Sequence, residues 1–382
     1  MAKKILFVFP SMGIGGTTVS TRNLISLLGK EGYDCLVMPL NQQGSLIHLY
    51  DDVKQVKTPF FVRVLSVSGW KKMPSFSQKL AAAVFRFLCK NCKSYERRII
   101  GKCFDNIIRK YNIDTVVACQ EAITTRLVSY AGIKSKVAWI RCDYRRRMEE
   151  MNTGREVFYE SFKAIVCVSD KTCEDFKAIY PEYAAKTYCI PNPQDGGLMA
   201  RRADEEEQEP RFTTDDITIV SVGRFDAVKR FDQIAPIARQ LKDKGLRFHW
   251  YLIGEGIERG RIEASIKEFV VEKEVIMLGV KANPYYYIKR ADVLVCLSRS
   301  EACPRVVNEA KILHTPTIST DFPTIYEFIK NGETGLIASL DDIPSTMLRY
   351  FDDDALRTNI KENINLFDFD NKKLMDSIMN IL

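Results

Sequence analysis

The sequence of 382 residues is poor in histidine and in the paired cysteines that bind metals. Its three histidines, His48, His249 and His314, lie far apart, and of its eleven cysteines only Cys89 and Cys92 form a C-x-x-C pair. A structural zinc site needs a second pair or clustered histidines, so the composition argues against one. The other cysteines stand singly, mostly inside apolar runs, as small buried side chains do in a reducing compartment.

The sequence also lacks any uninterrupted apolar run of about 18 residues, the length that a membrane-spanning helix needs. Its first residues, MAKKILFVFPSMG, have neither the long apolar stretch nor the small-residue cleavage site of a secretory signal. Together with the cysteine pattern, these absences predict a cytoplasmic protein.

What is present is an ordinary globular composition, with 46% of residues apolar and 27% charged. A chain of this length usually forms two hydrophobic cores. Residues 194–216 are polar, with a glycine pair, an acidic run and no apolar period. We therefore expect one domain over residues 1–195, a linker over residues 196–216 and a second domain over residues 217–370.

Both halves alternate apolar, β-branched runs of strand length with amphipathic stretches of helix length, a pattern that predicts an α/β fold with parallel sheets. The strands expected in the first half are Lys4–Pro10, Asp34–Leu40, Thr115–Cys119, Val137–Cys142 and Ala164–Ser169. Those expected in the second half are Ile217–Val222, Phe248–Ile253, Val275–Leu278, Val293–Ser298, Pro316–Thr320 and Thr334–Ala338.

The charge is distributed unevenly, because residues 53–110 carry 14 basic and only 2 acidic residues, a net charge of +12. Such a segment indicates an anionic partner. On a helix its basic residues share one face and its apolar residues share another, which we expect to pack on the domain. The basic set is Lys79, Arg86, Lys90, Lys93 and Arg97, and the apolar set is Leu80, Val84, Phe87, Leu88, Tyr95 and Ile99.

This pattern, with the aromatic residues Phe60, Phe61 and Trp70 nearby, predicts that residues 53–110 bind an anionic membrane surface. Two alternatives stay open. One is a basic face that is simply solvated. The other is a nucleic-acid site, although nothing in the sequence resembles a module that binds RNA or DNA.

A glycine-rich turn follows the first strand and contains Gly15 and Gly16. Such a turn lets backbone N–H groups approach a phosphate at the start of a helix. A dinucleotide fingerprint would need a third glycine near Thr18 and an acidic residue after the second strand, and both are missing. A hydride-transfer enzyme is therefore disfavoured. The turn remains a candidate contact to a donor phosphate or to an acceptor. The alternative is a tight turn that binds no ligand.

The second half begins in the same way, with Gly223, Arg224 and Lys229 after its first strand and a Gly254 turn after the next. The carboxyl ends of parallel strands form the ligand edge of such a sheet. Two cations at that edge suit a diphosphate, because arginine can bind it as a fork and lysine as a point charge. The alternative is that both are solvated surface cations.

Two carboxylates, Glu301 and Glu309, flank a further strand end. Pro304 is placed to be the first residue of the following helix, so that Glu301 lies in the loop and Glu309 about one and a half turns into the helix. The two would then reach different parts of one ligand and would not share a metal. The alternative is that Glu301 merely stabilises the helix N-terminus and that Glu309 is a solvated residue of the helix.

These stretches resemble the donor domain of retaining glycosyltransferases of family 4, which have the GT-B fold. The resemblance is specific in VGRFDAVKRFD, IGEG, SRSEACPRVVNEAKILHTPTISTDF and YEFIKNGETGLI. It continues more loosely in the first half through GGTTVSTRNLISLLGKEGYD, IVCVSDKTCEDF and CIPNPQD. It implies two Rossmann-like domains whose sheets face each other across a cleft, with the last helix, about residues 371–382, returning to the first domain.

The resemblance also implies roles for individual residues. The Glu-x7-Glu motif serves the nucleotide sugar, which assigns the sugar side to Glu301 and the ribose hydroxyls to Glu309. Arg224 and Lys229 would bind the donor diphosphate. With Glu301 they form the expected catalytic set.

Other residues are expected to bind the nucleotide or the acceptor. Those expected beside the nucleotide are Gly15, Gly16, Gly223, Gly254, Pro304 and Arg305. In many relatives a histidine that faces the donor sugar stands where this sequence has Arg141. We assign Arg141 and Asp143 to the acceptor side. Ala302 and Cys303 also depart from the family's usual pair.

The sequence therefore predicts an enzyme that moves a sugar from a nucleotide diphosphate sugar to an acceptor hydroxyl, with retention at the anomeric carbon. A glycan or lipid-linked acceptor in cell-surface polysaccharide or glycolipid synthesis is expected, on the inner face of the membrane, with no nucleic acid as partner. We expect no cofactor and no metal, and interpret Asp368-Phe369-Asp370 as a coincidental D-x-D.

Two alternatives are a non-catalytic nucleotide-sugar-binding or membrane-scaffold protein of the same fold, and a nucleotide-sugar epimerase. An epimerase would need acid/base histidines, of which the sequence has few.

Overall fold

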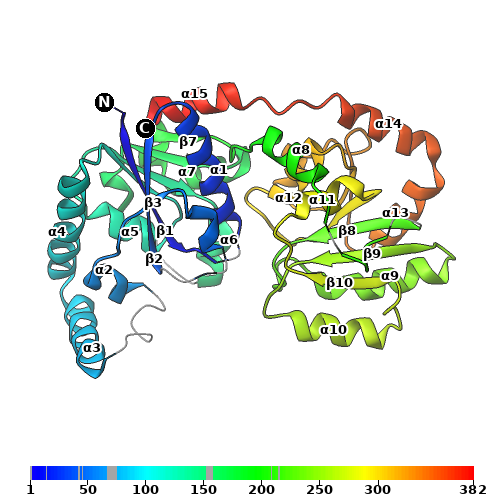
Figure 1. The fold of residues 1–382 in the computed structure, drawn as a ribbon, viewed down its shortest axis with the longest axis horizontal. Helices are drawn as coiled ribbons and strands as arrows, with labels where there is room; N and C mark the ends of the chain where they lie inside the picture. The colour runs from blue at the N-terminus through cyan, green and yellow to red at the C-terminus, as the bar shows by residue number, and fades with distance from the viewer. Residues whose placement is uncertain are drawn as a thin grey trace. The chain divides into compact units, whose positions relative to one another are not determined.

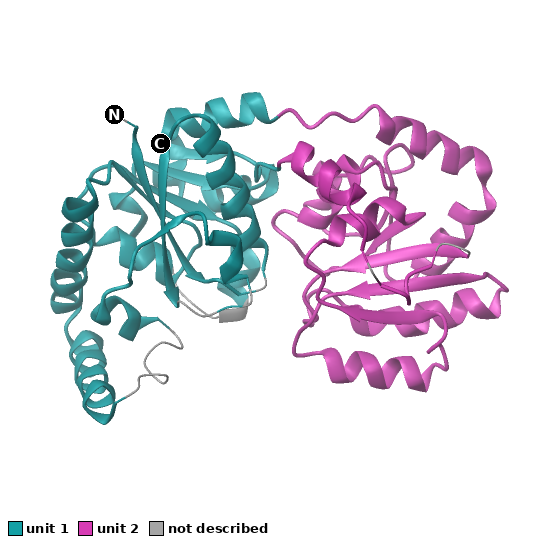
Figure 2. Cartoon of the chain, in the orientation of Figure 1, with its two compact units in different colours: residues 1–194, 371–382 teal, residues 195–370 magenta. Residues whose placement is uncertain are grey.

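The computed structural model describes the chain except for residues 1, 14, 42–43, 45, 67–74, 152–157, 208 and 214–215. The chain divides into two compact units (Figure 2). Unit 1 comprises residues 1–194 with 371–382, and unit 2 comprises residues 195–370. Trp70, which the sequence analysis places in the membrane-binding segment, lies outside the described residues.

The helices of unit 1 are labelled in Figure 1. This unit contains a seven-stranded parallel sheet in the order β3-β2-β1-β4-β5-β6-β7. Its strands are β1 (Lys4–Ser11), β2 (Asp34–Asn41), β3 (Lys54–Gln55), β4 (Thr115–Ala118), β5 (Lys136–Ile140), β6 (Ala164–Cys167) and β7 (Thr187–Cys189). Its helices are α1 (Gly16–Lys30), α2 (Phe60–Leu65), α3 (Phe76–Asn91), α4 (Lys93–Tyr111), α5 (Ile123–Ser129), α6 (Tyr144–Met151), α7 (Asp170–Ile179) and α15 (Asn371–Ile381).

The five central strands of this sheet are largely buried on both faces, as their continuous apolar sequences require. Leu6 and Val8 of β1 pack in one core cluster with Phe104 of α4 and Phe176 of α7. Phe7, which alternates with them, is equally buried but outside that cluster, as expected for a side chain on the opposite face.

Unit 2 contains a six-stranded parallel sheet in the order β10-β9-β8-β11-β12-β13. Its strands are β8 (Ile217–Val222), β9 (Phe248–Ile253), β10 (Val275–Gly279), β11 (Val293–Cys296), β12 (Thr317–Thr320) and β13 (Leu336–Ala338). Its helices are α8 (Gly196–Asp204), α9 (Ile234–Asp243), α10 (Arg259–Glu268), α11 (Pro284–Arg290), α12 (Arg305–Ile312), α13 (Ile343–Asp352) and α14 (Asp354–Asn365).

Two core clusters cover the two faces of this sheet. Ile219 and Val295 pack with residues of α9, α10, α13 and α14. Val220 and Leu294, which alternate with them, pack with residues of α8, α11 and α12. The predicted α/β fold class, with a parallel sheet in each of two Rossmann-like domains, is confirmed. Every strand expected from the sequence is present, with its ends shifted by at most a few residues. The edge strands β3 and β7 were not expected.

The sequence interpretation of residues 196–216 as a linker is wrong over its first part. Helix α8 lies there, and its residues Met199 and Ala203 are buried in the core of unit 2. Farther along, Glu209 forms ion pairs with Arg211 at 2.7 Å and with Lys281 at 2.6 Å. A short helix with only two buried positions shows little periodicity, so the polar composition of this segment concealed it.

The chain returns to unit 1 at its end. The main-chain oxygen of Leu382 accepts a hydrogen bond of 2.7 Å from Oγ1 of Thr115, at the start of β4. Ile378 and Ile381 of α15 are buried. The last helix therefore packs on the same unit as the first strand.

The basic residues from Lys79 to Arg97 lie on two helices and not on one, because the helical conformation is interrupted between α3 and α4 at Cys92. The prediction that the apolar set of residues packs on the domain is wrong for α3. Leu80, Val84, Phe87 and Leu88 are all exposed, and the buried residues of α3 are Ala82, Phe85 and Cys89. Among the helices of the described residues, none is both long enough and apolar enough to cross a membrane.

Candidate functional site

The connectivity of unit 2 brings the loops after β8 and β11 together. The chain adds β9 and β10 on one side of β8 and then returns to add β11, β12 and β13 on the other. The strand order therefore reverses between β8 and β11, and ligands of open α/β sheets bind outside the carboxyl ends of the strands at such a point. The β8 loop carries Arg224 and Lys229, and the β11 loop carries Glu301.

Glycines allow the loops after β8 and β9 to approach closely. Gly254 has φ of 152°, and a Cβ atom added there would lie 1.8 Å from the carbonyl oxygen of Gly223. A Cβ atom at Gly256 would lie 2.2 Å from the carbonyl oxygen of Phe225. The N–H of Gly223 donates to the oxygen of Ile253 at 3.0 Å. From the sequence, Gly254 is expected to let the backbone approach a ligand. The structure shows that its missing side chain makes room for the neighbouring backbone.

Lys229 and Glu301 form an ion pair at this edge. Nζ of Lys229 lies 2.5 Å from Oε1 of Glu301, and the two side chains are 23% and 12% exposed. Oγ of Ser298 donates to the same carboxylate oxygen at 2.6 Å. Burial lowers the pKa of Lys229, but neighbouring acidic groups, Glu301 foremost, raise it by more, so that the pKa lies above its ordinary value. Lys229 is therefore a charged ammonium at neutral pH.

Backbone contacts fix the two loops that carry this pair. Oγ1 of Thr324 donates to the main-chain oxygen of Glu301 at 2.5 Å, and the N–H of Arg299 donates to the oxygen of Val228 at 2.8 Å. The positions of Lys229 and Glu301 are thus set by the sheet and by hydrogen bonds that the main chain of their loops accepts.

Arg224 does not join this pair. Its side chain is 59% exposed, and Nε lies 2.7 Å from a carboxylate oxygen of Asp226. The opposite carboxylate oxygen of Asp226 accepts from the N–H of Lys229 at 3.1 Å. Asp226 therefore links the two predicted diphosphate-binding residues, with Lys229 half-buried and Arg224 open to solvent.

A second buried ion pair joins Arg305 and Glu309 on α12, one turn apart. Both side chains are largely buried, at 16% and 7% exposed. Burial lowers the pKa of Arg305, and Glu309 and Tyr285 raise it by more. Burial and then the Glu309 carboxylate raise the pKa of Tyr285, on α11, to about 12. We expected Pro304 to be the first residue of α12. It instead immediately precedes the helix, which begins at Arg305.

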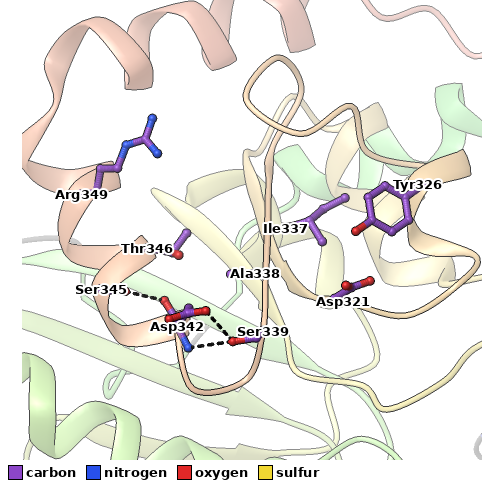
Figure 3. A pocket seen from close by; sticks show the side chains of 9 residues that line it. All are labelled: Asp321, Tyr326, Ile337, Ala338, Ser339, Asp342, Ser345, Thr346 and Arg349. Atoms are coloured by element: carbon purple, nitrogen blue, oxygen red, sulfur yellow. Dashed lines mark hydrogen bonds between the residues drawn. The ribbon is translucent and has the colours of Figure 1, made fainter.

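A hollow of about 530 Å³ opens at the far end of the same sheet edge, beside β12 and β13 (Figure 3). Asp342, Ser339 and Ser345 line it and are joined by hydrogen bonds at the start of α13. None of the predicted site residues lines this hollow. The cavity that does border Lys229 is narrow, about 10 Å³.

In unit 1, the predicted glycine turn leads directly into α1. Gly15 is the residue that precedes the helix, and a Cβ atom added to it would meet nothing within 4 Å. The backbone there is extended, so the sequence does not need glycine at this position for its conformation. Gly16 is exposed as the first helical residue. Ile14, which comes just before Gly15, lies outside the described residues.

Arg141 follows β5 and turns toward the interior of unit 1. Its guanidinium donates to Oδ1 of Asn192 at 2.5 Å and to Oγ of Ser20, and it lies 5.4 Å from the ring centre of Trp139. Asp143 accepts from the N–H of Arg146 at 3.1 Å and so supports the first turn of α6. The structure thus gives Arg141 polar partners on α1 and in the chain after β7.

No group of three or more histidine, cysteine, aspartate or glutamate residues that could hold a metal ion occurs among the described residues. The described cysteines are all free thiols, and several of them, such as Cys119, Cys167 and Cys296, are buried.

Sequence reasoning missed three residues of the unit 2 edge: Ser298, Thr324 and Tyr285. Ser298 lies at the end of a predicted strand, where a polar residue after an apolar run could have indicated it. Thr324 and Tyr285 belong to other segments, and only the folded structure brings them to the two glutamates.

Solved structures resemble the whole chain. The HepE protein of Anabaena in complex with UDP and glucose aligns with a TM-score of 0.76 and 14% identity, over 99% of this chain and 98% of that one. WaaG, a glycosyltransferase involved in lipopolysaccharide biosynthesis, aligns with a TM-score of 0.67 and 15% identity, over 99% of both chains. These likenesses, with the two parallel sheets, define the fold class as GT-B.

Sequence comparisons match the second unit. Residues 202–367 match the family described as Glycosyl transferases group 1. EpsF of Bacillus subtilis (strain 168) is 31% identical over 158 residues, 41% of this chain and 40% of that protein.

A second relative comes from Campylobacter jejuni, the N-acetylgalactosamine-N,N'-diacetylbacillosaminyl-diphospho-undecaprenol 4-alpha-N-acetylgalactosaminyltransferase. It is 29% identical over 150 residues, 37% of this chain and 40% of that protein. The chain thus matches about two fifths of the length of these curated relatives. The segment that carries Lys229, Glu301 and Glu309 is the one that matches the group 1 family.

Proposed function

We propose that this chain is a retaining glycosyltransferase that moves a sugar from a nucleotide diphosphate sugar to an acceptor hydroxyl. The observation that carries the proposal is the ion pair of Lys229 and Glu301 at the strand-order reversal of unit 2. This pair lies in the segment that matches the group 1 glycosyltransferases. A charged ammonium beside a carboxylate suits a ligand in which a diphosphate adjoins a sugar.

The expected chemistry follows from where charge develops. As the bond to the sugar breaks, negative charge moves onto the departing nucleoside diphosphate, and fixed cations there lower the barrier. The Lys229 ammonium has three donors, of which one serves Glu301, so the others can reach phosphate oxygens. Arg224, exposed on the same loop, can add a bidentate contact.

The two carboxylates receive different roles in this proposal. Glu301 contacts hydroxyls of the donor sugar, and Glu309 contacts hydroxyls of the ribose. Arg305 holds one oxygen of Glu309 and leaves the other for the nucleotide. The cations neutralise the diphosphate, so the proposed reaction requires no metal and no other cofactor.

The acceptor is proposed to be a glycan, or a glycan linked to a lipid, in the synthesis of a cell-surface polysaccharide or glycolipid. The name of the Campylobacter jejuni relative describes a diphospho-undecaprenol substrate for that enzyme. The net charge of +12 over residues 53–110 favours binding to the cytoplasmic face of an anionic membrane, where the reaction would take place. We assign Arg141 and Asp143 to the acceptor side, and Gly15 and Gly16 to the nucleotide.

The test is release of nucleoside diphosphate from a panel of UDP-, GDP- and ADP-sugars, with and without polyprenyl-diphosphate-linked glycans, followed by proton NMR of the product's anomeric signal. Turnover with retained configuration is expected for one donor. A product with inverted anomeric configuration would overturn the retaining mechanism and leave the proposed glycosyltransferase activity in place.

A non-catalytic protein of the same fold is the second candidate, favoured by Arg141 where many relatives carry histidine. It would bind a nucleotide sugar without releasing nucleoside diphosphate under any of these conditions. That result would overturn the proposed activity.

A further inference from the structure

Helix α3 exposes a continuous apolar stripe. Phe76, Leu80, Val84, Phe87 and Leu88 are spaced so that all five share one face of the helix. They are 82%, 56%, 51%, 68% and 41% exposed. Single exposed apolar residues are ordinary, but five on one face of a 16-residue helix mark a surface that binds something apolar.

The opposite face of α3 anchors the helix to unit 1. Ala82, Phe85 and Cys89 are buried there, and the ring of Phe85 lies 4.7 Å from that of Phe61 on α2. A guanidinium nitrogen of Arg86 donates to the main-chain oxygen of Val64 at 2.9 Å. The stripe therefore cannot turn inward without loss of these contacts, and the fold itself holds it outward.

Charge identifies the occupant of this surface. Helix α3 contains three basic residues and no acidic residue, and Lys79 and Lys90 are exposed along one edge of the stripe. Lys93 and Arg97, both exposed, follow at the start of α4. Apolar residues with a basic border are typical of a helix that lies in the interface of an anionic bilayer. At a length of about 24 Å, with its other face attached to the unit, α3 is suited to lie along the surface.

We propose that α3 lies in the plane of an anionic bilayer and inserts its apolar stripe, Phe76, Leu80, Val84, Phe87 and Leu88, below the headgroups. Lys79 and Lys90 then contact anionic headgroups at the border. This inference rests on the membrane partner of the proposed function and adds the mode of binding. Attachment depends on insertion of apolar side chains, and Coulomb attraction is secondary.

The first experiment compares two triple variants of the full chain by sedimentation with vesicles of 70% phosphatidylcholine and 30% phosphatidylglycerol. Phe76→Ser/Leu80→Ser/Phe87→Ser removes the three most exposed residues of the stripe. Ile257→Ser/Val270→Ser/Leu366→Ser removes three equally exposed apolar residues of unit 2, at 90%, 58% and 83% exposed. We expect the stripe variant to bind at least about 100-fold more weakly and the control to bind like the parent.

The second experiment measures insertion directly. Phe87→Trp places an indole in the stripe, and vesicles with brominated acyl chains should quench its fluorescence beyond the quenching of the parent's own tryptophans. Lys79→Gln/Lys90→Gln should weaken binding by about 30-fold at low salt, at about 1 kcal/mol per charge.

The outcomes separate this inference from the proposals on which it rests. Equal vesicle binding by parent and stripe variant, with no added quenching of the Phe87→Trp indole, would overturn insertion and leave a membrane partner in place. No vesicle binding by the parent would overturn both. Conversion of a parent dimer to monomers by the stripe variant, without vesicle binding, would make this face a protein interface and overturn the inference. None of these readouts depends on sugar transfer.

Discussion

The ammonium nitrogen of Lys229 lies 2.5 Å from Oε1 of Glu301, although 72 residues separate the two in the chain. The strand order of unit 2 explains this contact, since β8 and β11 are neighbours and their following loops meet at one edge. Buried charges are rarely left without a partner, because desolvation is costly. In the proposed function a nucleotide sugar offers its diphosphate to the lysine and its hydroxyls to the glutamate.

Glu309→Gln should weaken binding of a nucleoside diphosphate by about 1.5–3 kcal/mol, because the ribose loses a charge-assisted hydrogen bond. The decisive readout is ribose dependence. Calorimetric titration should show that the parent prefers the ribonucleotide to its 2'-deoxy analogue, and that the variant largely loses this preference. Thermal unfolding of the same variant measures the separate cost of breaking its pair with Arg305. An undiminished preference would make Glu309 a structural residue only.

Gly254→Ala should destabilise the candidate site, because the new Cβ atom would lie 1.8 Å from the carbonyl oxygen of Gly223 at a φ of 152°. The loops after β8 and β9 would have to separate, which displaces Lys229. We expect a lower unfolding temperature together with weaker nucleotide binding. Gly260→Ala is the matched control, since nothing lies within 4 Å of its added Cβ atom in α10. Equal behaviour of the two variants would contradict this account of the turn.

Glu209 should contribute to stability in a pH-dependent way. The Arg211 guanidinium, with Lys281, lowers the pKa of this carboxyl from 4.5 to about 2. Because the pKa of Glu209 is lower in the folded state, its ionised carboxylate stabilises the folded state fully at pH values above about 4.5. This stabilisation decreases as the pH falls below 4.5 and is lost as the pH falls through about 2. The difference in unfolding free energy between parent and Glu209→Gln should therefore be full at pH 6 and shrink below about pH 4.5.

Glu333→Gln, at an exposed ion pair with Lys330, serves as the control and should show little difference at any pH. Urea unfolding at pH 6, 4.5 and 3 measures both variants. A Glu209→Gln difference that stays constant over this range would exclude the ion pairs of Glu209 as its cause.

Much of this fold could be predicted because buried parallel strands are nearly continuous apolar runs. Val293–Cys296 and Ile217–Val222 are examples, and polar residues follow each at the ligand edge. The strands β3 and β7 could not be predicted from the sequence, because they are short edge strands whose partly exposed residues form no apolar run. The nine residues of α8 are too few, and too polar, to show a period.

Side-chain environment was harder to predict than secondary structure. Helical spacing groups Leu80, Val84 and Phe87 on one face, but it does not say whether protein covers that face. The buried face of α3 consists of Ala82, Phe85 and Cys89, a smaller and less apolar set. In the same way, the Glu-x7-Glu spacing indicated two ligand carboxylates, while the partners Lys229 and Arg305 that hold them became visible only in the folded structure.

Calorimetric titration of the full chain with UDP, GDP and ADP tests the central claim most directly when Lys229→Gln is measured beside the parent. The control is Lys289→Gln, a lysine paired with Asp204 away from the site. We predict that the parent binds one nucleoside diphosphate, that the control equals it, and that Lys229→Gln binds about 10-fold to 150-fold more weakly, the loss of a charge-assisted bond of about 1.5–3 kcal/mol. Equal affinity of parent and Lys229→Gln, or no binding of any of the three by the parent, would contradict the account.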